Sequence, residues 1–222
     1  MTPPRKSTDA RTATAHHEAG HAVLSAAINA HPERVSIRGH EGTLGRSAQK
    51  MVGPPTFLAQ VYLAGFAAEH LLTSRRPRSL DVEVGLGLLA HLDPYLVATI
   101  DGVGASDGYG AVHQVLCSGV REVEAEVRVE VERLYGLARE SLRAVWPSVK
   151  AVAEALLERE ELDAAGLDAA IGEADIYMRV FTVQQAHGLL PAPLRHPAGR
   201  NQCEGCSQTL PLQPAPTGQS ES

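Results

Sequence analysis

The sequence predicts a mainly α-helical domain, and three observations support this prediction. Apolar residues make up 44% of the 222 residues, whereas aromatic residues make up only 4%. A core made chiefly of Ala, Val and Leu suits helices that pack closely on small side chains. Several segments also repeat apolar residues at steps of three and four, which is the period of one helix face. We therefore expect a compact helical fold with one short strand or hairpin.

We expect the domain to occupy residues 9–189. Residues 1–8 are polar and contain two prolines, so we expect a flexible N-terminus there. Residues 190–222 are rich in Pro, Gly, Ser and Gln, a composition that predicts a disordered tail. A chain of this length can bury the core of one such domain.

The first helix is expected from Thr8 or Asp9 to about Ala30. Either Thr8 or Asp9 can cap it, because their side-chain oxygens accept hydrogen bonds from the free amides of the first turn. Pro32 cannot continue the helix and so limits it. Alanine recurs along the helix, which would let neighbouring helices approach it closely.

A short hairpin or pair of strands is expected within residues 33–50, beside the first helix. Side chains alternate in character from Arg34 to Arg38, and a glycine-containing turn leads to a second extended piece near Gly42–Ser47. An unpaired strand around Val35–Ile37 could hold a peptide substrate by adding it as a further strand. A hairpin that only packs on the core explains the pattern equally well.

The rest of the chain predicts further helices and one irregular region. Pro54 and Pro55 lead into a helix from Thr56 to about Leu72. Glycines are frequent in residues 92–119, which we expect to form a surface loop. The other expected helices run from about Leu80 to before Pro94, from Ser118 to Trp146, from Pro147 to about Glu161, from Asp163 onward, and within residues 172–189.

The first helix contains the sequence HHEAGHAV, in which His17, Glu18 and His21 form an HExxH pattern. A helix turns by about 100° per residue, so His17 and His21 lie on one face and can bind the same metal ion. Two imidazoles and one carboxylate can hold a catalytic zinc ion and leave its fourth position to water. Glu18 could take a proton from that water as the water attacks a peptide carbonyl. The alternative is an ordinary core helix with surface histidines.

Three downstream carboxylates could complete the metal site. Glu69 lies near the end of the second helix, and Asp81 and Glu83 follow in the third. Asp81 and Glu83 project from different sides of their helix, so at most one of them should reach the ion. The spacing of the apolar residues does not choose among the three carboxylates.

Charge and cysteine content narrow the classes of partner and compartment. A net charge of −6 disfavours a nucleic-acid partner, which needs clustered Lys and Arg. The longest apolar stretch, Phe57–Leu72, contains polar residues and is shorter than the ~20 residues of a membrane span. Three cysteines and a polar N-terminus without a signal-peptide pattern favour a reducing, cytoplasmic location. Cys203 and Cys206 form a CxxC, which supplies two ligands where a closed zinc site needs four.

These segments resemble the peptidase domain of the FtsH family of AAA+ zinc metalloproteases over residues 12–170. TAHHEAGHAV resembles the family's metal helix, LAGFAAEHLL its second helix, and SLDVEVGLGLL the segment that supplies its aspartate ligand. The resemblance implies that His17, His21 and Asp81 bind Zn²⁺ and that Glu18 is the catalytic acid/base. It also suggests that Glu69 could orient one of the ligating imidazoles.

The resemblance is incomplete. Phe66 and His70 stand where the family usually has Arg and Glu, and no segment resembles its ATPase module or its membrane spans. We therefore expect a zinc-dependent endopeptidase that cleaves unfolded or flexible polypeptides without ATP. The alternative is a catalytically degenerate domain that acts as an adaptor or regulator of a full-length protease. Association into a homo-oligomeric ring is an expectation from the resemblance alone.

Overall fold

The computed structural model describes residues 9–28, 32–38, 46–49, 53–93, 106–121, 123–172 and 175–189. All of them belong to the unit Met1–Pro191. The predicted flexible N-terminus (1–8) and the predicted disordered tail (190–222), with Cys203 and Cys206, fall outside the described residues.

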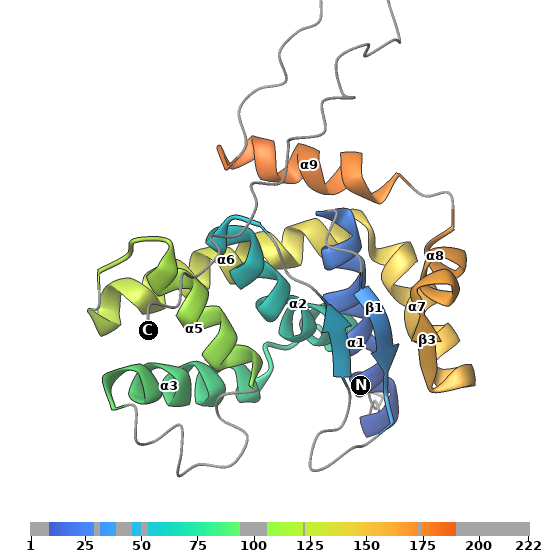
Figure 1. Ribbon diagram of the computed structural model, residues 1–222, viewed down its shortest axis with the longest axis horizontal. Coiled ribbons are helices and arrows are strands. Elements are labelled where there is room, and N and C mark those ends of the chain that lie inside the picture. The colour runs from blue at the N-terminus through green and yellow to red at the C-terminus, as the bar shows by residue number, and fades with distance from the viewer. Residues whose placement is uncertain are drawn as a thin grey trace, which may run out of the picture. The chain divides into compact units, whose positions relative to one another are not determined.

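The described chain is mainly helical, which confirms the predicted fold class (Figure 1). None of the described helices is both long enough and apolar enough to cross a membrane. In chain order the elements are α1 (Ala10–Ala27), β1 (Pro32–Ser36), β2 (Arg46–Gln49), α2 (Pro55–Thr73), α3 (Arg78–Leu92), α5 (Asp107–Cys117), α6 (Glu124–Ala144), α7 (Trp146–Arg159), β3 (Glu161–Asp163), α8 (Ala164–Ile171) and α9 (Ile176–Ala186).

The centre of the core is the crossing of α1 and α2. Helix α1 packs on α2 and α7, and α2 packs in addition on α5 and α6. A Cβ at Gly20 would lie 2.6 Å from the Ala64 carbonyl oxygen and 2.8 Å from the Ala68 Cβ. The two helices therefore touch almost through bare backbone, which only small residues permit. The alanine-rich sequence of α1 predicted this close approach.

Helix ends follow from local chemistry. Asp9 Oδ1 accepts a hydrogen bond from the Thr12 N–H at 2.7 Å and caps α1. Pro55 lies in the first turn of α2, where a backbone amide is not needed. Asp163 Oδ1 accepts a hydrogen bond from the Gly166 N–H at 2.8 Å and caps α8, as the sequence predicted.

The strands form a three-stranded antiparallel sheet in the order β2-β1-β3. The predicted pairing of two extended pieces is confirmed, and the three-residue strand β3 joins them from the other end of the chain. Of the two alternatives for this segment, the free strand near Val35–Ile37 is wrong, because β1 is the central strand. Val35 pairs with Ser47 on one side and with Leu162 on the other. A substrate strand cannot pair with β1, so any such addition would have to use an outer strand.

The expectation of a surface loop over residues 92–119 is also wrong where the structure describes that region, because α5 occupies residues 107–117. The glycines of this segment serve close packing rather than loop formation. A Cβ at Gly108 would lie 2.4 Å from the carbonyl carbon of Glu83, and one at Gly110 would lie 2.4 Å from Cε1 of Tyr62. Helix α5 therefore lies directly on α3 and α2.

Candidate metal centre

His17 and His21 meet on the inner face of α1. Their side chains are only 17% and 6% exposed, and their ring centroids lie 4.8 Å apart. The four-residue spacing therefore brings the two imidazoles together, as the sequence predicted. The neighbouring His16 has a structural role, since its Nδ1 lies 2.9 Å from the Thr12 carbonyl oxygen and its ring packs on Trp146.

Helix α2 fixes the orientation of both imidazoles. The His17 Nδ1–H donates to Glu69 Oε1 and the His21 Nδ1–H donates to the Val61 carbonyl oxygen, each at 2.7 Å. A backbone carbonyl can only accept, so the His21 Nδ1 must carry the proton. In the neutral imidazoles, each Nε2 then keeps its lone pair and can bind a metal. The contact of Glu69 with a motif histidine is the one that the sequence suggested.

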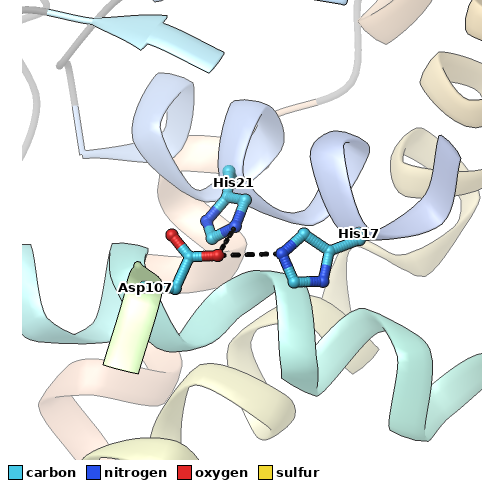
Figure 2. Close-up of side chains that lie close together, drawn as sticks. All are labelled: His17, His21 and Asp107. Carbon is cyan, nitrogen blue, oxygen red and sulfur yellow. Dashed lines mark hydrogen bonds and ion pairs between the residues drawn. The ribbon is translucent and has the colours of Figure 1, made fainter. Parts of the chain in front are cut away.

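Asp107, the first residue of α5, brings a third ligand atom to the two imidazoles. Its Oδ2 lies 2.9 Å from His17 Nε2 and 3.1 Å from His21 Nε2 (Figure 2). The ligand atoms of the three residues all lie within 4.8 Å of one another. Two lone-pair nitrogens and a carboxylate are all acceptors, so only a shared cation can hold them together.

Without a metal ion, a proton on each Nε2 would let both imidazoles donate to Asp107 Oδ2. Burial disfavours charge on both histidines, but the contact with Asp107 outweighs it and raises the pKa of His17 and of His21. Burial also disfavours charge on Asp107, yet the two histidines lower the pKa of that carboxyl. The site therefore stabilises a bound positive charge, which a metal ion would also supply.

Gly65 of α2 lets both imidazoles pack directly against the backbone of that helix. A Cβ built on Gly65 would come within 2.4 Å of His17 Nε2 and 2.5 Å of His21 Nε2. A carbon atom cannot approach a ring nitrogen so closely, so a larger residue at this position would displace the imidazoles. The donor set itself fits a zinc ion.

Two known proteins are similar to most of this chain. The ATP-dependent zinc metalloprotease YME1L of Drosophila melanogaster is 29% identical over 187 residues, which cover 75% of this chain and 25% of that protein. The ATP-dependent zinc metalloprotease FTSH 9, chloroplastic/mitochondrial, of Oryza sativa subsp. japonica is 30% identical over 167 residues, which cover 68% of this chain and 20% of that protein. The chain contains an FtsH-like peptidase domain. It spans a quarter or less of the length of these two relatives, and no family model matches it.

Asp81 does not reach the candidate metal centre of the FtsH-like domain. Its side chain is 65% exposed, and its Oδ1 accepts a hydrogen bond from the Arg76 guanidinium at 2.7 Å. Leu80 and Val84 are the residues of this turn that face the core, so the side chain of Asp81 is turned towards solvent. The structure therefore does not bring Asp81, the third ligand that the resemblance implied, to the two histidines, whereas it brings Asp107 to both.

Glu83 lies closer to the centre than Asp81 but does not join the cluster of ligand atoms. Its Oε2 accepts a hydrogen bond from the Gly108 N–H at 3.3 Å, in the first turn of α5. Burial raises the pKa of Glu83, although this hydrogen bond opposes the shift. Of the two carboxylates on α3, Glu83 thus contacts the helix that carries Asp107.

Glu18 lies next to His17 and is 7% exposed. No described residue forms a hydrogen bond with its carboxylate, although buried carboxylates usually have such a partner. Burial raises the pKa of Glu18, while His21 and His17 act against this shift. A buried acid with unused acceptor atoms beside a metal centre is available for chemistry on a bound water or substrate.

The sequence contained a signal for α5 that the glycines concealed. Ser106 Oγ accepts a hydrogen bond from the Tyr109 N–H at 3.2 Å and caps this helix. Ala111, Val112 and Val115 then follow at helical spacing and are fully buried. A helix-capping serine before an apolar face would have placed Asp107 in the first turn of a buried helix.

Proposed function

We propose that the FtsH-like domain is a zinc-dependent endopeptidase in which His17, His21 and Asp107 are the protein ligands. The observation that carries this proposal is the convergence of their three ligand atoms within 4.8 Å of one another. Two imidazoles and one carboxylate form a donor set found in catalytic zinc sites, where one coordination position stays open. Zinc bound there would polarise a peptide carbonyl and lower the pKa of a water molecule.

Glu18 is the residue that moves protons in this proposal. Its carboxylate would accept a proton from the attacking water and deliver it to the leaving amine. Glu69 and the Val61 carbonyl oxygen hold the two imidazoles in the tautomer that presents Nε2. The chain's own residues therefore supply both the ligands and the acid/base, and neither function requires ATP.

The proposed substrates are unfolded or flexible polypeptides. A peptide bond inside a folded domain is rarely exposed, because ordinary stabilities of ~5–15 kcal/mol keep the open fraction very small. An unfolded chain has lost this protection and can present its carbonyls to the centre directly. A cytoplasmic location, expected from the sequence, and association into a ring, expected from the resemblance alone, stay predictions.

Metal analysis combined with digestion of one substrate in two states tests this proposal. The purified protein should contain one zinc ion per chain and should cleave a reduced and carboxymethylated protein but not its native form. A chelator should stop cleavage, and ATP should not change it. Absence of zinc in a chelator-free preparation would overturn the zinc site. Zinc without cleavage of either form would instead favour the adaptor function.

A further inference from the structure

We propose that Glu83 is a positioning residue, which holds the first turn of α5 so that Asp107 meets His17 and His21. This inference rests on the zinc site proposed above. It assigns to α3 the task of placing the third ligand, although none of its side chains joins the cluster of ligand atoms.

Asp107 needs support from outside its own helix. It is the first residue of α5, and a helix cannot satisfy the N–H groups of its own first turn. Ser106 Oγ accepts from the Tyr109 N–H at 3.2 Å, which is the usual local cap. Glu83 Oε2 accepts from the Gly108 N–H at 3.3 Å, and this second cap comes from another helix. The residue directly after Asp107 is therefore tied to α3.

Glycines bring the two helices close enough for this hydrogen bond. A Cβ at Gly108 would lie 2.5 Å from the Cβ of Glu83, and one at Gly87 would lie 2.9 Å from the Cα of Tyr109. Helices α3 and α5 thus meet through backbone at two successive points. Such a contact leaves α5 little freedom to slide, so the position of α3 determines where Asp107 lies.

The chemistry of Glu83 argues for more than packing. Its carboxylate is partly buried next to a second carboxylate, that of Asp107, and like charges so placed repel each other. An apolar side chain could fill this space at less cost. The hydrogen bond that Glu83 accepts from the Gly108 N–H offsets this cost, and it acts on the turn that carries Asp107.

Asp81 provides a matched control on the same helix. It is also an acidic residue of α3, and it lies two residues before Glu83. Its side chain is 65% exposed and pairs with Arg76 at the surface, where such pairs contribute about 0–1 kcal/mol. Loss of Asp81 should therefore leave the position of α5 unchanged.

The experiment compares Glu83→Ala, Glu83→Gln and Asp81→Ala with the unmodified full chain. Zinc affinity is measured by competition with a chromogenic chelator, and amide exchange of residues 106–117 is measured by mass spectrometry on the zinc-free protein. Loss of a partner that orients a metal ligand typically weakens metal binding about 10–100-fold, and we expect this for Glu83→Ala. The amide of Gly108 should also exchange faster. Glu83→Gln should recover most of both properties, because its amide oxygen can still accept, and Asp81→Ala should change neither.

Zinc affinity and amide exchange distinguish the possible failures. A role in packing alone would lower the thermal stability of Glu83→Ala but leave the zinc affinity of the folded protein unchanged, and that result would overturn the inference. Equal weakening by Asp81→Ala would overturn it as well. If the unmodified protein binds no zinc, the proposed function itself fails. If the unmodified protein binds zinc tightly and Glu83→Ala is the only one of the three variants that binds it weakly, both the zinc site and the role of Glu83 are supported.

Discussion

The two halves of the candidate metal centre are built in different ways. The histidine half lies within one continuous helix, α1, where spacing along the chain places His17 beside His21. The carboxylate half is the first residue of α5, which reaches the histidines only because α5 packs on α3 and α2. The histidine side chains are 17% and 6% exposed, whereas that of Asp107 is 27% exposed.

Local helix structure therefore sets the positions of the two imidazoles, whereas packing between helices sets the position of the Asp107 carboxylate. Hydrogen bonds to Glu69 and to the Val61 carbonyl oxygen fix the imidazoles on a rigid helix pair. The carboxylate depends on contacts between helices that the chain joins through residues 94–105. We therefore expect substitutions in the histidine half to abolish zinc binding or hydrolysis. Substitutions of residues that support the carboxylate half should instead displace Asp107.

The largest expected effect lies in the histidine half, at Glu18. Glu18→Gln should keep zinc but lose hydrolysis, because the amide cannot accept a proton from the attacking water at neutral pH. General-base assistance is typically worth about 10²–10⁴ in rate, so turnover should fall by that factor. Steady-state digestion of an unfolded substrate, with zinc content measured in parallel, checks this. Turnover above about a tenth of the normal rate would count against the role of Glu18.

The next effect tests the carboxylate half. Asp107→Ala should weaken zinc binding by more than the ~10–100-fold typical of residues that only support a ligand, because it removes a ligand atom. Asp81→Ala should bind zinc normally, since Asp81 pairs with Arg76 at the surface. Chelator competition on both variants measures the difference. A normal zinc affinity in Asp107→Ala would show that the carboxylate half is not part of the centre.

The same contrast explains which residues could be predicted from the sequence. A fixed spacing within one helix predicts the positions of His17, Glu18 and His21. The resemblance of α2 to the family's second helix suggested the contact of Glu69 with His17. Asp107 lies 86 residues after His21 in a glycine-rich segment that reads as a loop. Glycine indicates either a turn or a close contact, and only the packed structure shows which. The spacing of residues left three carboxylates open, and the resemblance of residues 79–89 to the family's ligand segment led to Asp81, whose side chain faces solvent.

A smaller effect is expected when a methyl group is added at Gly65, against which both imidazoles pack. Gly65→Ala would place a methyl group 2.4 Å from His17 Nε2, so the imidazoles must move away from α2. Such overpacking typically costs about 1–3 kcal/mol of stability, and zinc binding should weaken with it. Denaturant unfolding and chelator competition measure both changes.

Gly136→Ala is the matched control for this variant, because a Cβ at Gly136 of α6 would meet nothing within 4 Å. This substitution in a helix interior should leave zinc binding unchanged and stabilise the protein by about 0.5–1 kcal/mol. If Gly65→Ala binds zinc as tightly as Gly136→Ala, close packing of the imidazoles on Gly65 is not needed to hold the ion.

The smallest expected effect is the pH dependence of stability in the zinc-free protein, where the hydrogen bond between His17 and Asp107 connects the two halves. Burial opposes charge on His17, but its hydrogen bonds to Asp107 and Glu69 outweigh this and raise its pKa from 6.5 to about 10. A raised pKa in the folded state contributes stability that is fully present below pH 6.5 and is lost as the pH rises towards about 10. The free energy of unfolding of the zinc-free protein should therefore fall over this range, and His17→Gln should show a shallower fall.

Zinc should reverse the sign of this pH dependence, because it binds the deprotonated imidazoles and its affinity rises with pH. Urea unfolding at several pH values, with chelator or with excess zinc, measures both slopes. Equal slopes in the two conditions would mean that proton and metal do not share the site between the histidine half and the carboxylate half.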